Sequence, residues 1–233
     1  MEMLDILISL LTLTLLEVVL GIDNLVFLAI ISQRLPKHQQ ASARRFGLTL
    51  AWIMRLMLLF SALWLTKLTS PVMTLFSFEF SGRDIFLIAG GLFLLTKATQ
   101  EIHAALEQTR EDTTISVKHI SFAMVVTQIA VLDIVFSLDS ILTAIGLTNR
   151  FWLMAVAITI AIIAMLFASE PLSRFIERHP TIKMLALSFL IMIGMVLIAD
   201  GFNYHVPRGY IYFAMAFSLF VELLNMIARK RRN

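Results

Sequence analysis

The sequence predicts an all-α, polytopic membrane protein with seven transmembrane helices, arranged as an inverted 3+3 repeat followed by one extra helix. Of the 233 residues, 59% are hydrophobic and 15% are charged, with a mean hydropathy of +0.86, so the charged residues are too few to cover the apolar ones in a soluble domain. Seven segments reach the roughly 20 apolar residues that a spanning helix needs. A motif that carries acidic residues occurs in the first of these segments and returns in the fourth.

The first repeat, about residues 5–103, begins with a span over residues 5–31. The short stretch before this span is acidic, whereas a signal peptide is basic there, and the apolar run is longer than a signal peptide requires, so we expect it to be retained. The second span, residues 46–66, follows the connection Leu35-Pro36-Lys37, whose proline is typical of a loop.

The third span, residues 84–103, follows a connection that contains Pro71. It is the least apolar of the seven. Its uninterrupted apolar run stops at Leu95, and it reaches full length only by including Lys97 and Glu101.

The second repeat, about residues 119–201, holds three further spans, and the extra helix covers residues 208–228. Prolines at 180 and 207 mark two of the connections. No linker is long enough to separate two domains, so the sequence predicts a single transmembrane domain over residues 1–233. The spans of this repeat are residues 119–147, 151–170 and 182–201.

Lysine and arginine separate between alternate connections, which gives a predicted orientation. Fourteen follow odd-numbered spans and four follow even-numbered spans, with Arg55 left inside the second span. Because positive residues concentrate on the cytoplasmic side, we expect the N-terminus outside and the C-terminus in the cytoplasm. The fourteen are Arg34, Lys37, Arg44, Arg45, Lys97, Arg110, Lys118, Arg174, Arg178, Lys183, Arg229, Lys230, Arg231 and Arg232, and the four are Lys67, Arg83, Arg150 and Arg208.

The repeated motif places acids at equivalent positions of the first and fourth spans. Glu17 corresponds to Asp133, 116 residues later, and the pair Asp23-Asn24 corresponds to Asp139-Ser140. An ionised acid inside a membrane costs several kcal/mol and marks a functional site by default. Because the first span runs inward and the fourth outward, the two copies are antiparallel, as in transporters with inverted repeats and a site near the midplane.

The depth of the four acids follows from the helical rise. Glu17 and Asp133 lie at the centres of their spans, near the middle of the bilayer. Asp23 and Asp139 lie about 9 Å away along the helix axes, toward the inside and the outside respectively. In straight helices the four acids would form a column across the membrane.

The helical phase leaves a second geometry open. Asp23 and Asp139 point about 100° away from the stripes that contain the central acids. They either serve a separate step, or the helices open at Gly21 and Ser137 and bring all four acids around one ion. The two stripes are Glu17, Gly21 and Asn24, and Asp133, Ser137 and Ser140.

The candidate ligands are all oxygen donors, which suits a hard divalent cation such as Mg²⁺, Ca²⁺ or Mn²⁺. The chain has no cysteine, so a thiolate site and a disulfide framework are both excluded. Carboxylates that lie close together repel one another unless a cation or protons neutralise them, which makes proton exchange a simple coupling mechanism. The predicted metal ligands are Glu17, Asp23, Asn24, Asp133, Asp139 and Ser140.

Basic residues inside the spans are the candidate counter-ions or coupling groups. Arg55 lies about 13 Å inside the second span by helical rise, too deep to reach the interface easily, and we expect it to pair with an acid of span 1 or 4. A structural tether is the alternative. Lys97 and Glu101 are i, i+4 neighbours near the cytoplasmic end of the third span, a spacing that often only stabilises a helix end.

The acid-bearing motifs resemble those of the TerC family of integral membrane proteins, especially its short members without a cytoplasmic domain. The resemblance covers nearly the whole chain and rests mainly on residues 16–24 and 132–140. It implies a seven-helix fold related to the LysE-type exporters, with manganese efflux among the functions of the members and tellurium resistance in the family name. Many members have a proline shortly after the second Asp-Ser, where this chain has Ile141-Leu142-Thr143. A proline there would break the fourth helix, so its absence is an argument against the broken-helix geometry in the second repeat.

We therefore expect a bacterial inner-membrane transporter that exports a divalent cation, Mn²⁺ first, in exchange for protons. The alternatives are a transporter of another solute, such as Ca²⁺, an amino acid or a tellurium-related ion, and a membrane scaffold or assembly factor without transport. An intramembrane aspartyl hydrolase is disfavoured because Gly21-Ile22-Asp23 lacks the second glycine usual at such sites. We expect no enzymatic activity, no cofactor and no nucleic-acid partner; the lipid bilayer and the transported ion are the expected partners.

Overall fold

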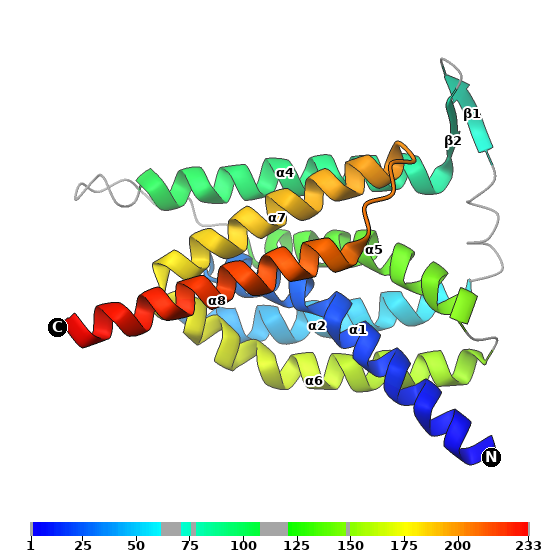
Figure 1. Cartoon of the computed structure of the whole chain (residues 1–233), viewed down its shortest axis with the longest axis horizontal. Helices are drawn as coiled ribbons and strands as arrows, with labels where there is room; N and C mark the ends of the chain where they lie inside the picture. The colour runs from blue at the N-terminus through cyan, green and yellow to red at the C-terminus, as the bar shows by residue number, and fades with distance from the viewer. Residues whose placement is uncertain (1, 62–70, 76–77, 108–120, 148–149, 233) are drawn as a thin grey trace. The chain divides into compact units, whose positions relative to one another are not determined.

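The computed structural model describes residues 2–61, 71–75, 78–107, 121–147 and 150–232. These residues form seven helices and one short β-hairpin, and each helix coincides with one predicted span (Figure 1). The all-α membrane fold predicted from the sequence is confirmed. Five helices are long and apolar enough to cross a membrane over the ranges Met3–Ser32, Gly82–Glu107, Phe151–Arg178, Pro180–Gly201 and Arg208–Ala228.

The chain forms two compact units that combine elements of both predicted repeats. One comprises Met1–Arg83 and Val117–Phe175, and the other comprises Asp84–Ser116 and Ile176–Asn233. The first unit therefore holds the first two helices of each repeat. The second unit holds the third helix of each repeat and the extra helix.

Four helices build the first unit: α1 (Glu2–Ser32), α2 (Lys37–Phe60), α5 (Phe122–Leu147) and most of α6 (Phe151–Arg178). α1 packs against both α2 and α5, and α2 packs against α5. α1 and α5 run in opposite directions (Figure 1), as the inverted motif predicts. Large apolar side chains fill the interior, among them Leu28, Ile30, Ile31, Leu48, Val125, Leu132 and Ile158.

Two helices of this unit differ from the predicted bounds. α2 begins at Lys37, directly after Pro36, rather than at residue 46. α6 continues to Arg178 instead of stopping at residue 170. In both cases the additional turns are polar, so hydropathy alone does not reveal that they are helical.

A β-hairpin, β1 (Pro71–Leu75) and β2 (Phe78–Ser81), lies in the connection between the second and third spans. The strands are antiparallel, with Leu75 paired to Phe78 and an irregularity between Pro71 and Met73. The sequence predicts only a loop over this stretch, because strands this short have little periodicity.

The second unit contains α4 (Gly82–Glu107), α7 (Pro180–Gly201) and α8 (Arg208–Arg232). The backbones of α4 and α7 touch: a Cβ atom at Gly91 would lie 2.5 Å from the carbonyl oxygen of Gly194. Small residues allow helices in membranes to approach this closely. α8 packs against α7 and leaves most of its apolar side chains exposed, as expected for a helix that faces lipid.

Candidate functional site

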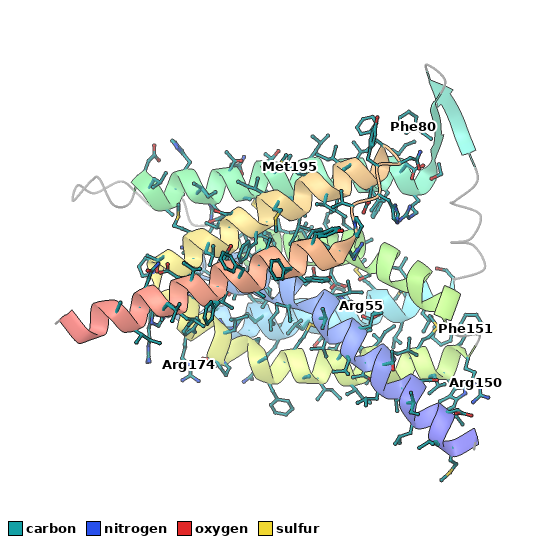
Figure 2. The ribbon with its side chains drawn as sticks, viewed as in Figure 1. Arg55, Phe80, Arg150, Phe151, Arg174 and Met195 are labelled. Carbon is teal, nitrogen blue, oxygen red and sulfur yellow. The ribbon has the colours of Figure 1, made fainter. Side chains whose placement is uncertain are left out.

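Arg55 is the centre of the candidate site. It lies on the buried face of α2 (Figure 2), and its guanidinium joins acids from two other helices of the first unit. Nη1 donates to Oε2 of Glu17 on α1 at 2.8 Å, and Nη2 donates to Oδ1 of Asp133 on α5 at 2.7 Å. Nε also faces the Asp133 carboxylate, 3.1 Å from Oδ2. The two acids that match each other in the repeat therefore meet at one cation.

Two further polar side chains hold Asp133. Nδ2 of Asn24 on α1 donates to Oδ1 of Asp133 at 3.2 Å. One helical turn after Asp133, the hydroxyl of Ser137 donates to the main-chain carbonyl of Asp133 and lies 3.1 Å from its Oδ2. The Asp133 carboxylate is thus fixed by groups from three helices.

The cluster is buried and holds more acidic groups than basic ones. Glu17, Arg55 and Asp133 are 3%, 2% and 5% exposed, and two carboxylates face one guanidinium. Charges removed from water in this way are tolerated only when they are paired and hydrogen-bonded. Arg55 supplies that pairing for both acids with a single positive charge.

One oxygen at the site has no partner. Oδ1 of Asn24 is buried and accepts no hydrogen bond from any described residue, although its Nδ2 is engaged with Asp133. Buried polar atoms are nearly always hydrogen-bonded, so an orphaned acceptor beside two carboxylates is a candidate ligand atom for a cation.

The structure brings together three of the predicted ligands, Glu17, Asn24 and Asp133. Asp23 is buried on α1, 8% exposed. The side chains of Asp139 and Ser140 lie outside the described residues. Ser137, which the sequence places on the same stripe as Asp133 without naming it as a ligand, is part of the cluster; its i+4 spacing from an intramembrane acid was the available signal.

Both acid-bearing helices are continuous. α1 runs without interruption through Gly21, and α5 runs without interruption through Ser137. Of the two geometries that the sequence leaves open, the structure shows the unbroken helices. Gly21 serves close packing instead, because a Cβ atom there would lie 2.6 Å from the sulfur of Met165 on α6.

Within the described part of the chain, no group of three or more His, Asp or Glu side chains is positioned to hold a metal ion. Around Arg55 the cluster contains two carboxylates, one amide oxygen and one hydroxyl.

The other two predicted coupling residues, Lys97 and Glu101, lie on α4 in the second unit. Nζ of Lys97 is 3.5 Å from Oε1 of Gln100 and 5.9 Å from the centre of the Phe93 ring. Glu101 is buried. Lys97 therefore packs along its own helix, in line with a structural role.

The charge pattern of the sequence also predicts Arg44 in a cytoplasmic connection, and the structure corrects this. Arg44 lies in α2 and is 4% exposed. Its partners are Glu170 and Ser173 of α6. Counting charges near the ends of spans cannot distinguish such a buried arginine from one in a loop.

Comparison with known proteins relates the whole chain to a family. Residues 3–233 match the model described as the integral membrane protein TerC family. The chain is 52% identical over 220 residues to the UPF0053 inner membrane protein YgdQ of Escherichia coli K12, covering 94% of this chain and 92% of that protein. A UPF0053 protein of Haemophilus influenzae is 48% identical over 223 residues, covering 96% and 94% of the two chains.

A longer relative matches equally well over part of its length. The UPF0053 inner membrane protein YoaE of Escherichia coli K12 is 51% identical over 222 residues, which cover 95% of this chain and 43% of YoaE. The chain thus spans less than half of that relative. No solved structure matches the chain.

Proposed function

Because the chain belongs to the TerC family of integral membrane proteins, we propose that it is an inner-membrane transporter that exports a hard divalent cation, with Mn²⁺ as the first candidate, in exchange for protons. The observation that carries the proposal is the convergence of Glu17 and Asp133, from two oppositely directed helices, on the single cation Arg55.

The donor atoms of the cluster favour a hard cation. Carboxylate, amide and hydroxyl oxygens are ligands that Mg²⁺, Ca²⁺ and Mn²⁺ prefer, whereas copper and zinc favour imidazole or thiolate. The unpartnered Oδ1 of Asn24 adds a neutral oxygen to the two charged groups. A cation that retains some of its water needs no larger set of protein ligands.

Arg55 suggests how loading and release alternate. While the site holds no ion, the guanidinium compensates part of the acid charge and keeps Glu17 and Asp133 from repelling each other. An arriving divalent cation competes with Arg55 for the same oxygens. Protonation of one acid weakens its hold on the cation, and Arg55 then pairs with the acid that stays ionised.

A second candidate function rests on the same contact. Arg55 uses all three of its nitrogens in bonds to the two acids, as a purely structural link among α1, α2 and α5 would. The chain would then be a membrane scaffold or assembly factor without transport.

Neutral, nearly isosteric substitutions separate the two functions. We expect Glu17→Gln and Asp133→Asn each to abolish Mn²⁺ uptake into inside-out membrane vesicles while the protein still inserts, because each change removes a charge and an oxygen ligand. Glu107→Gln, which alters an exposed acid of α4 that pairs with His103, is the matched control and should transport normally. Normal transport by both site variants would show that Glu17 and Asp133 are not the cation site, whereas a lack of Mn²⁺ uptake by the unsubstituted protein would favour the scaffold.

A further inference from the structure

A second buried arginine on α2 joins this helix to α6. Arg44 donates from Nη2 to Oε2 of Glu170 and, at 3.3 Å, from Nη1 to Oγ of Ser173. Glu170 also lies 3.8 Å from Nε of Arg174, which is on the outer side of α6 (Figure 2). We call Arg44, Glu170 and Ser173 the inner cluster, because the predicted orientation places it at the cytoplasmic end of the helices.

The turn after α1 also contacts the inner cluster. Nε2 of Gln33, in the turn after α1, lies 3.5 Å from the main-chain oxygen of Ser173. Nε2 of Gln40 on α2 in turn lies 2.9 Å from the oxygen of Leu35. Three helices of the first unit, α1, α2 and α6, therefore meet at the inner cluster.

The inner cluster and the Arg55 site share one face of α2. Arg44 and Arg55 are eleven residues apart, or three turns and about 16 Å along the axis. Leu48 and Ala51 lie between them on this face and are buried. The same arrangement, an α2 arginine facing a carboxylate of another helix, thus occurs at two depths along the helix.

The two arginines differ in how firmly they are held. Every nitrogen of Arg55 bonds to a carboxylate. Nε of Arg44 is buried without a hydrogen-bond partner among the described residues, and one of its bonds goes to a neutral hydroxyl. Glu170 is also 48% exposed, so its carboxylate is far less enclosed than those of Glu17 and Asp133. The Arg44–Glu170 contact is therefore the easier of the two to release.

α6 contains a weak point beside this contact. Pro171 follows Glu170 inside the helix and, lacking an N–H group, cannot donate to the carbonyl of Phe167. Helices bend at such positions. The last turns of α6 can then move relative to the preceding part when Glu170 releases Arg44.

We propose that the Arg44–Glu170 ion pair is the inner gate of the cation path, and that Glu170 is the first carboxylate to meet the divalent cation. The cation competes with Arg44 for Glu170, the pair opens, and the buried face of α2 between the two arginines becomes accessible from the cytoplasm. The proposal rests on the transport function proposed above and adds the side of entry and the residues that control it.

The absence of cysteine from the chain makes a direct test possible. A cysteine introduced by Ala51→Cys lies between the two arginines, and one introduced by Ser42→Cys lies at an exposed position near the same end of α2. In inside-out vesicles a membrane-impermeant thiol reagent should label Ser42→Cys rapidly and Ala51→Cys slowly. Adding Glu170→Gln or Arg44→Gln should accelerate labelling of Ala51→Cys about tenfold, within the range that one coupling contact supports.

Two further variants guard against misfolding. The double change Arg44→Gln with Glu170→Gln leaves neither charge of the pair behind, and it should accelerate labelling as each single change does. Arg45→Gln, which removes the adjacent exposed arginine, should have no effect. Right-side-out vesicles should show slow labelling in every case, whereas a misfolded protein would be labelled from both sides.

The labelling experiment tests the gate independently of the transport assay. Unchanged labelling of Ala51→Cys in the double variant, or equal acceleration by Arg45→Gln, would overturn the gate even if Glu17→Gln abolishes transport. Acceleration confined to the Arg44 and Glu170 variants in inside-out vesicles supports the gate. Normal transport by Glu17→Gln would then count against the proposed function alone.

Discussion

At the scale of single residues, one guanidinium, that of Arg55, pairs with the two buried carboxylates of Glu17 and Asp133. Removing one partner of a buried ion pair costs about 3–5 kcal/mol because a charge is left uncompensated. Glu17 and Asp133 each depend on the same guanidinium. The stability of the site therefore depends on the positive charge of Arg55.

This dependence gives a stability prediction. In Arg55→Gln, Glu17 and Asp133 face each other without a counter-ion, so we expect a lower melting temperature in detergent than for the unsubstituted protein. Mn²⁺ should raise the melting temperature of the variant more than that of the unsubstituted protein, because a ligand that binds only the folded state stabilises it and no longer competes with the guanidinium. Equal shifts in the two proteins, or equal shifts with Na⁺, would contradict competition between Arg55 and the cation.

The residues of the site differ in how visible they are in the sequence. Glu17, Asp133 and Arg55 stand out because a charge in an apolar run is expensive, and the repeat pairs the two acids by their equivalent positions alone. The sequence predicts that Arg55 pairs with an acid of the first or fourth span, but not that it contacts both acids, since that depends on how three helices pack. The prediction for Arg44 was wrong for the same reason: its partner Glu170 on α6 is what shows that it is buried.

At the scale of helices and strands, hydropathy located all seven helices and failed where a helix is polar or a strand is short. α2 begins at Lys37 because Pro36 favours a helix start directly after it, a local signal that a count of apolar residues ignores. The hairpin formed by β1 and β2 was missed because its strands, of five and four residues, are too short to show an alternating pattern.

Helix contact in the second unit depends on glycine, which gives a prediction for α4 and α7. In Gly91→Ala the new Cβ atom would lie 2.5 Å from the backbone oxygen of Gly194 and 2.7 Å from Ile198, so the helices must separate. We expect a loss of about 1–3 kcal/mol, the usual cost of overpacking, seen as a lower melting temperature. Gly209→Ala, where nothing lies within 4 Å of the new atom, is the control and should melt normally.

At the scale of the whole chain, the predicted orientation can be tested by fusions. Because fourteen basic residues follow odd-numbered spans and four follow even-numbered ones, a reporter fused after Asn233 should be active in the cytoplasm, and one inserted after Arg150 should be active outside. Activity of the Asn233 fusion outside would overturn the orientation, and with it the assignment of Arg44 and Glu170 to the inner side.

The continuous form of α1 and α5 bears on how an ion would cross the membrane. In an unbroken helix, Asp23 lies about 9 Å from Glu17 along the axis, and Asp139 lies as far from Asp133 in the opposite direction. Acids at these depths can relay a proton or receive an ion but are too distant to complete a shell at the central site. Continuous helices are the geometry in which the sequence predicts a column of acids, and the column itself stays a prediction.

This arrangement predicts that binding and coupling separate. Asp23→Asn and Asp139→Asn should each slow proton-driven Mn²⁺ uptake in inside-out vesicles and shift its dependence on pH, while the purified variants still bind Mn²⁺. Glu17→Gln should lose binding itself, because it removes a ligand at the centre. Isothermal titration of the three variants beside the transport assay distinguishes these effects. If Asp23→Asn and Asp139→Asn lost binding as completely as Glu17→Gln, the acids would act as one shell around a single ion, and α1 and α5 would have to open at Gly21 and Ser137 during transport.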